Sequence, residues 1–491
     1  MTDVKELVQD LQKQGYIITP EALKMIKEAD NPDELIHKAL QCIQEPIIDI
    51  KCFETKEKTK ITPEEKKQEE TYLFNPIGKK IESQVKIINN GISEKSSSTG
   101  KYDDFVEHFR NRYSKIAEIL KNRGLNGYVP VNMLKKKQNE KTKIIIMINE
   151  KRTTKNGHIF ITGEDPTGQV NVLIPKSSRE LLSFADKIIP DEIIAIDGRL
   201  SKELYIADKI YQPDLPLREM QKTEEDIALV TISDMHIGSK LFLKKQFEEF
   251  IEWINGRKGD PGQRKLAEKV KYITIAGDTV DGIGIYPGQE ESLSITDIFE
   301  QYQKFTEYIK QIPEHIHIII APGNHDAVKN ADPQPKLPEE LIPELYKMKN
   351  VTLVGSPSLI SIHGIKVLIY HGTCFIDIIN SIPGSKFDAG ALMMKEMLIR
   401  RHVHPVYGGK PITPEKEDSM VITTVPDIFH CGESHNNSYE NYKGTMCINS
   451  GTWQSLTDYQ IKQGHKATPA IVPVVELKYG KIKVINFDKE I

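Results

Sequence analysis

The sequence is poor in cysteine and has no large excess of charge of either sign. Its five cysteines show no C-x-x-C spacing, which argues against both a disulfide framework and a zinc finger. The formal net charge is -4, so the chain lacks the overall basic character that nucleic-acid-binding domains often have. Any contact with nucleic acid must therefore come from local patches.

Long hydrophobic runs are also missing. No apolar run approaches the ~18 residues needed to span a bilayer, and the opening segment MTDVKELVQDLQKQG lacks the hydrophobic stretch of a signal peptide. We therefore expect a cytoplasmic protein that does not associate with membranes. At 491 residues the chain exceeds what one hydrophobic core usually serves, so two or three folded units are expected.

The first part of the chain is predicted to hold a small helical interaction module over residues 1–50. Thr19-Pro20 and Asn31-Pro32 are typical helix starts. Apolar residues recur at helical spacing at Val4, Leu7, Val8 and Leu11. Residues 51–102 mix charges of both signs with few aromatics and little periodicity, which predicts a flexible linker.

Residues 103–218 are predicted to form a β-barrel domain behind a leading helix, DDFVEHFRNRYSKIAEILKNRG. Five short β-rich segments follow this helix: KIIIMI, HIFITGED, VNVLIP, EIIAIDG and LYIADKI. Five such strands favour an OB fold, whose usual partners are single strands or oligosaccharides. The alternative is a barrel that only docks against a neighbouring domain.

Residues 219–491 alternate strands with helices, which is typical of an α/β domain. Polar residues follow the strand ends, where open α/β sheets place their ligands. Five strand ends carry short motifs, with glycine alongside to allow tight turns. The motifs are SDMHIG at 233–238, GDTVDG at 277–282, GNHD at 323–326, YHG at 370–372 and GESH at 432–435.

These motifs supply the side chains that a two-metal phosphoesterase site needs. Hydrolysis of a phosphodiester uses two cations roughly 3.5–4 Å apart, which activate water and neutralise charge on the transition state. Carboxylates and an Asn carbonyl suit Mn²⁺ and Mg²⁺, whereas several imidazoles favour Mn²⁺, Fe²⁺, Co²⁺, Ni²⁺ or Zn²⁺. We therefore expect two divalent cations, with Mn²⁺ as the first choice.

The chain order D-x-H, GDxxD, GNHD, YHG and GxxH resembles the calcineurin-like metallophosphoesterase superfamily, which includes nucleases and serine/threonine phosphatases. The resemblance implies a metallophosphoesterase sandwich with Asp278 bridging two metals. His325 would donate a proton to the leaving oxygen or stabilise its charge, and Asp281 could orient it. The implied ligands are Asp234, His236 and His435 for one metal, and Asn324, His371 and Glu433 for the other.

One motif departs from the family pattern. The last motif is usually G-H-x-H, but this chain has Glu433 in place of the first histidine. A glutamate can still offer an oxygen to a metal, so Glu433 is predicted to be a ligand. The alternative is that Glu433 marks a weakened second site.

The layout of helical module, linker, OB-like barrel and metallophosphoesterase domain resembles the small subunits of archaeal family D DNA polymerases. That resemblance implies a 3′-to-5′ proofreading exonuclease within a two-subunit replicative polymerase, acting on single-stranded DNA or a primer 3′ end. A large catalytic subunit would be the partner, and polymerase activity would belong only to the complex. The alternatives are a weak or inactive structural B subunit, and a phosphatase or phosphodiesterase of the same superfamily.

Two local basic patches are candidates for contact with nucleic acid. Arg400, Arg401 and His404 lie between two metal motifs, where they could touch phosphates. Lys151 and Arg152 lie in a predicted barrel hairpin that could follow a nucleic-acid backbone. The alternative is that both patches are only solvated surface charge.

Overall fold

A computed structural model describes residues 17–29, 47–48, 74–92, 96–124, 127–385, 390–462, 464 and 466–488. The chain divides into two compact units, Met1–Tyr72 and Leu73–Ile491. No helix in the described ranges is long and apolar enough to cross a membrane.

The first unit contains the helix α2 (Pro20–Glu28) and two short parallel strands, β1 (Ile17–Ile18) and β2 (Ile47–Ile48). The Thr19 side chain accepts a hydrogen bond from the Ala22 amide at 3.3 Å, and Pro20 opens the first turn. This capping confirms the helix start predicted at Thr19-Pro20. The apolar residues between Val4 and Leu11, and Asn31-Pro32, lie outside the described residues.

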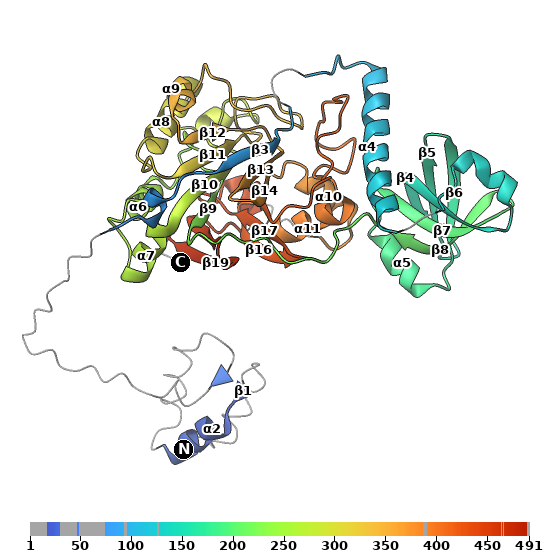
Figure 1. The fold of residues 1–491 in the computed structure, drawn as a ribbon, viewed down its shortest axis with the longest axis horizontal. Coiled ribbons are helices and arrows are strands. Elements are labelled where there is room, and N and C mark those ends of the chain that lie inside the picture. The colour runs from blue at the N-terminus through green and yellow to red at the C-terminus, as the bar shows by residue number, and fades with distance from the viewer. Residues whose placement is uncertain are drawn as a thin grey trace, which may run out of the picture. The chain divides into compact units, whose positions relative to one another are not determined.

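The larger unit contains two six-stranded sheets (Figure 1). The first has the order β12-β11-β10-β9-β18-β19. Its strands are β9 (Ala228–Ile232), β10 (Val270–Ala276), β11 (His317–Ala321), β12 (Val351–Leu353), β18 (Ile471–Glu476) and β19 (Lys481–Asn486). Strands β9 to β12 are parallel, and β9 and β10 are buried along their whole length, as their continuous apolar sequences predict.

The second sheet has the order β16-β17-β15-β14-β13-β3. Its strands are β3 (Val85–Asn89), β13 (Ser358–Ile362), β14 (Ile365–Ile369), β15 (Ile428–Cys431), β16 (Asn437–Tyr442) and β17 (Thr445–Ser450). One buried cluster joins side chains of both sheets, including Leu229, Ile319, Val367 and Ile448, so the sheets pack face to face.

Helices cover the outer faces of this sandwich. Against the first sheet pack α6 (Lys244–Ile254), α7 (Pro261–Lys269) and α8 (Ile298–Ile309). Against the second pack α10 (Phe375–Ser381) and α11 (Gly390–Arg400). The short helices α9 (Pro343–Lys347) and α12 (Asp458–Lys462) complete this part of the chain. The result is a four-layer α/β/β/α arrangement, which confirms the α/β class.

The predicted linker 51–102 is wrong for its second half. Residues Val85–Asn89 form β3, which pairs antiparallel with β13 at the edge of the second sheet. Part of the polar stretch after β3 is also fixed to the sandwich domain. Ser96 Oγ and the Ser97 amide each donate to the Glu415 carboxylate at 2.6 Å. An edge strand that is mostly exposed carries little hydrophobic pattern, and its partner lies far along the chain.

The predicted barrel is present. Five strands close in the order β4-β5-β6-β8-β7 (Figure 1). They are β4 (Lys141–Thr153), β5 (Ile159–Asp165), β6 (Gly168–Ile174), β7 (Ile193–Ser201) and β8 (Leu204–Tyr211). The helix α5 (Arg179–Asp186) lies between β6 and β7 in the chain, and the predicted leading helix is α4 (Tyr102–Asn122). That this barrel is an OB fold stays a prediction.

A buried ion pair ties α4 to the sandwich domain. Arg112 Nε donates to Asp418 Oδ2 at 2.7 Å, and His402 Nε2 lies 3.0 Å from the same oxygen. Burial alone would raise the pKa of Asp418, but His402 and Arg112 together hold that pKa well below its usual range. The ionised pair therefore fixes the helix that leads into the barrel.

Replacing Asp418 with alanine is expected to lower the free energy of unfolding by about 3–5 kcal/mol, because it leaves the buried Arg112 charge unpaired. Since the folded pKa of Asp418 is depressed, the stabilisation is present above the unfolded value of ~3.9 and is lost as the pH falls. Urea unfolding at pH 7 measures the change. The control is Glu252→Ala, which breaks an exposed pair with Arg257 and should cost under about 1 kcal/mol.

Candidate metal centre

The predicted metal ligands, together with His325 and Asp281, all lie in loops that follow strands at one end of the sandwich. Residues of the 233–238, 277–282 and 323–326 motifs follow β9, β10 and β11 of the first sheet, and those of 370–372 and 432–435 follow β14 and β15 of the second. Because the two sheets face each other, the loops converge on one buried place. Five non-glycine residues there have a positive φ of 50–64°: Asp234, His236, Asp278, Glu433 and His435. Such backbone conformations are costly and gather at functional sites.

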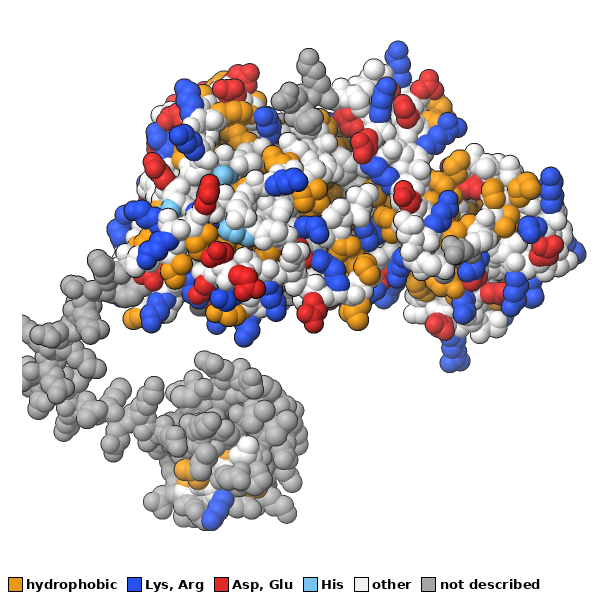
Figure 2. All heavy atoms as spheres, viewed as in Figure 1, with side chains coloured by type: hydrophobic (Ala, Val, Ile, Leu, Met, Phe, Trp, Pro, Cys, Tyr) orange, Lys and Arg blue, Asp and Glu red, His pale blue; other side chains and the backbone are white. Residues whose placement is uncertain are grey.

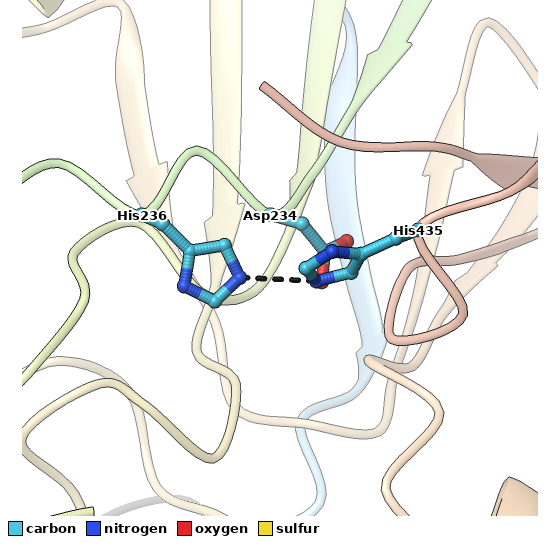
Figure 3. Close-up of side chains that lie close together, drawn as sticks. All are labelled: Asp234, His236 and His435. Atoms are coloured by element: carbon cyan, nitrogen blue, oxygen red, sulfur yellow. Dashed lines mark hydrogen bonds and ion pairs between the residues drawn. The ribbon is translucent and has the colours of Figure 1, made fainter. Parts of the chain in front are cut away.

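Asp234, His236 and His435 form the first cluster, and their side chains point toward one another in Figure 3. His435 Nε2 lies 3.4 Å from Asp234 Oδ1 and 3.1 Å from His236 Nε2. His236 Nδ1 donates to Asp281 Oδ1 at 3.0 Å, so its Nε2 lone pair faces the cluster. A carboxylate and two imidazoles aimed at one point form a typical ligand set for a divalent cation.

Asp278 and His371 form a second cluster beside the first. His371 Nδ1 donates to the Ala276 carbonyl at 2.7 Å, which leaves Nε2 facing two carboxylates. Nε2 lies 3.3 Å from Asp278 Oδ2 and 3.0 Å from Glu433 Oε2. Burial alone would lower the pKa of His371, but the Asp278 charge and the contacts with both carboxylates raise it well above its usual range. Glu433 therefore faces the second ligand set.

One buried atom of the predicted ligand set lacks a hydrogen-bond partner: it is Asn324 Oδ1, in the loop after β11. A buried polar atom without a partner costs about 1–3 kcal/mol, so such an atom needs an explanation. Within the described residues, Asp234, Asp278 and Glu433 also form no ion pair with lysine or arginine. An orphaned amide oxygen, and carboxylates that have no lysine or arginine partner, together fit the binding of divalent cations.

His325 and Asp281 are linked differently from the expectation. His325 Nδ1 donates to the backbone carbonyl of Asp281 at 2.8 Å, while the Asp281 carboxylate stays 3.9 Å away and holds His236. Asp281 thus orients His325 through its main chain and His236 through its side chain. The His325 side chain is 18% exposed, so it reaches the mouth of the site.

The environment of His325 suits a proton donor. Burial alone would lower the pKa of His325, but the Asp278 charge and the hydrogen bond to Asp281 outweigh it, and the pKa is raised. The His325 amide also donates to Asp278 Oδ1 at 2.9 Å. The imidazole is therefore positioned beside the ligand cluster and favoured in its protonated form.

Sequence reasoning gave no role to Asp326 or Gln289. The buried Asp326 carboxylate accepts from the amides of Thr279 and Gly323 at 3.2 and 2.9 Å, so it joins the loops after β10 and β11. The position of Asp326 in the GNHD motif is the sequence feature that could have indicated this role. Gln289 donates from Nε2 to the Asp281 carbonyl at 2.9 Å, and no spacing in the sequence indicates this contact.

The predicted contacts of Arg400, Arg401 and His404 with nucleic acid are wrong. Arg400 is 2% exposed and pairs with Glu192 of the barrel at 2.6 Å. The other two are buried as well: Arg401 donates to the backbone carbonyls of Ile422 and Thr423, before β15, and His404 Nδ1 lies 2.8 Å from the Asp332 carboxylate. These residues stabilise the interior and the contact between barrel and sandwich.

The barrel hairpin patch is also smaller than predicted. Lys151 Nζ donates to the carbonyls of Ala185, Asp186 and Ile188, so its three donors are used at the end of α5. Arg152 is exposed, with its guanidinium 4.7 Å from the Phe160 ring centre, and its contact with nucleic acid stays a prediction. On the face seen in Figure 2, basic and acidic side chains are interspersed.

Comparison of the sequence with known proteins finds one matching family and several similar proteins. Residues 229–440 match the family of B subunits of DNA polymerases alpha and epsilon. The chain is 36% identical over 495 residues to the DNA polymerase II small subunit of Methanothermobacter thermautotrophicus, covering 99% of this chain and 100% of that protein. It is 37% identical over 484 residues to the same-named protein of Archaeoglobus fulgidus, covering 96% of each chain. With the Methanocaldococcus jannaschii protein of that name, identity is 40% over 407 residues, or 82% of this chain and 68% of the relative.

Proposed function

This chain belongs to the family of archaeal DNA polymerase II small subunits, and on that premise we propose that it hydrolyses DNA as a metal-dependent 3′-to-5′ exonuclease. The observation that carries the proposal is the convergence of buried carboxylates and imidazoles: in each of two groups, Asp234, His236 and His435, and Asp234, Asp278 and His371, the possible ligand atoms lie within 4.8 Å of one another. The name of its relatives, small subunit, supports a large catalytic subunit as partner. In this proposal the barrel is an OB fold and the sandwich a calcineurin-like metallophosphoesterase.

The residues divide into ligands and a proton donor. One cation would be held by Asp234, His236 and His435, and the other by Asn324, His371 and Glu433, with Asp278 shared. When bound, two cations supply an activated water and neutralise negative charge on the phosphate, Mn²⁺ being the first choice. His325 donates its proton to the leaving 3′ oxygen, and the Asp281 carbonyl keeps the imidazole aimed.

Two other functions compete with this proposal. A structural subunit with a weak or retired site would be favoured if Glu433 faced away from the ligands, but Glu433 Oε2 lies 3.0 Å from His371 Nε2. A phosphatase or phosphodiesterase would use the same ligands on a smaller ester and leaves the barrel without a role.

The test is hydrolysis of 3′-labelled and 5′-labelled single-stranded DNA by the purified chain, alone and with the large subunit. Mn²⁺, Mg²⁺ and chelator are compared. Stepwise, metal-dependent loss from the 3′ end is expected. No cleavage by a folded sample with any metal would instead establish a structural subunit.

Metal binding is expected to release protons. The pKa of His371 is raised in the metal-free protein, so a cation at Nε2 must displace a proton from that atom. Apparent metal affinity should therefore fall as the pH is lowered and rise as it is increased. Isothermal titration with Mn²⁺ in buffers of different ionisation enthalpy counts the protons. A count of zero at neutral pH would exclude His371 as a ligand.

A further inference from the structure

A loop beside the candidate metal centre exposes three large apolar side chains. Ile283, Ile285 and Tyr286 are 40%, 38% and 44% exposed. Single exposed apolar residues are common on protein surfaces. Three within four residues form a contiguous group, and such groups more often mark a contact surface. We call residues 283–286 the apolar loop.

The apolar loop begins next to the main chain of His325. A Cβ added at Gly282 would be 2.2 Å from the His325 carbonyl oxygen and 3.1 Å from Ile285 Cδ1, so both neighbours meet at that glycine. The loop follows Asp281, whose carbonyl holds the His325 imidazole. The apolar loop therefore starts beside the main chain of His325, next to the residue that holds the imidazole of the proposed proton donor.

Hydrogen bonds from two buried glutamines fix the loop. Gln289 Oε1 accepts from the Ile285 amide at 2.9 Å, and its Nε2 binds the Asp281 carbonyl at the same distance. Gln301 Oε1 accepts from the Gly282 amide at 2.9 Å. The backbone of the loop is thus held before any ligand arrives, and the Tyr286 hydroxyl lies 2.9 Å from Ser292 Oγ, which lowers the entropy cost of a contact.

The charge of the loop limits what it can bind. Residues 282–292 contain no lysine or arginine, and Glu290 and Glu291 are exposed at their end. Lys240 Nζ lies at that end, where it donates to the Glu291 carbonyl at 2.7 Å, so residues 283–286 themselves offer a phosphate no cation. The uncharged face of a base, in contrast, can stack on their apolar and aromatic side chains. We propose that the apolar loop stacks against a base of single-stranded DNA near the scissile phosphodiester, an inference that rests on the proposed function.

The test is a double-mutant cycle between the loop and the base. The protein forms are the full chain and its Ile283→Ala/Tyr286→Ala variant, both loaded with Mn²⁺. The oligonucleotides have phosphorothioate 3′ linkages that resist hydrolysis, and carry either normal bases or one abasic residue at each of the last three positions in turn. Fluorescence anisotropy gives the dissociation constants. Tyr479→Ala is the matched control, because Tyr479 is 46% exposed but follows β18 at the opposite end of the sheet from Asp234.

The parental chain is expected to bind one of the abasic oligonucleotides about tenfold more weakly than normal DNA, and the double variant should lose this discrimination. Tyr479→Ala should behave as the parent. Equal discrimination by parent and double variant at every position overturns the inference. Unchanged DNA binding with loss of co-elution with the large subunit also overturns it, because the loop would then be a subunit contact.

DNA binding and DNA hydrolysis are measured in separate experiments. The loop contact and the nuclease activity can therefore be refuted independently of each other. If the cycle shows coupling but unmodified DNA is not cleaved with any metal, the loop contact stands and the nuclease proposal fails. If DNA is cleaved but the cycle shows no coupling, the nuclease proposal stands and the loop contact is refuted.

Discussion

Replacing His325 with alanine should lower metal-dependent DNA hydrolysis by roughly 10²–10⁴-fold, the usual contribution of a general acid. The imidazole reaches the mouth of the site, and its pKa is raised, so it is available to protonate the leaving oxygen. The substitution removes no proposed ligand, so bound Mn²⁺ measured by elemental analysis should stay at the parental level.

The metal measurement decides between two roles for this side chain. His325 also lies within ligand distance of His236 and Asp278, so it could hold a cation itself. Loss of metal in His325→Ala would show that it is a ligand and would refute the proton-donor role. His325→Asn keeps an amide that can donate to the Asp281 carbonyl, and it should be as inactive as the alanine variant if proton donation is what matters.

A matched histidine controls for general damage. His317 opens β11, the strand that His325 follows, and thus lies at the opposite end of the sheet. His317→Ala should retain parental hydrolysis. Equal losses in His317→Ala and His325→Ala would mean that the sheet, and not the site, had been disturbed.

The candidate site was predictable from the sequence because its signals are local. An apolar run such as ALVTI defines a buried strand, and the polar residue that follows it must lie at the end of that strand. The family resemblance that the motif order carries then grouped residues such as Asp234 and His435, although they are far apart in the chain. The structure brings together six of the predicted ligands, Asp234, His236, Asp278, His371, Glu433 and His435, whereas Asn324 as a ligand stays a prediction.

The features that sequence reasoning predicted wrongly or missed depend on partners that are distant in the sequence. The sequence around Arg400 predicts a charge on the surface. Nothing near Arg400 in the chain indicates that Glu192 of the barrel neutralises its charge in the interior. Arg112 and Asp418 pair across 306 positions, and neither lies in a recognisable motif. The edge strand β3 likewise needs β13 to define it. Local patterns predict elements and their ends, whereas burial of charge is decided by tertiary pairing.

Replacing Asp278 with asparagine should weaken both cations at once. Asp278 Oδ2 lies 3.3 Å from His371 Nε2 and 3.7 Å from His236 Nε2, so its carboxylate borders both ligand sets. Loss of outer hydrogen-bond partners typically costs 10–100-fold in metal affinity, and loss of a shared anionic ligand should cost about 100-fold or more. Asparagine can still accept from the His325 amide through Oδ1, so the fold should be retained.

Comparison with Asp281→Asn makes this prediction specific. The Asp281 carboxylate contacts His236 and lies away from His371, so its replacement should weaken only the cation held by His236, by about 10–100-fold. Titration with Mn²⁺ should therefore show two weakened sites in Asp278→Asn and one in Asp281→Asn. If Asp278→Asn loses only one cation, Asp278 does not bridge. Its carboxylate would then belong to a single ligand set, and the two clusters would bind their cations independently.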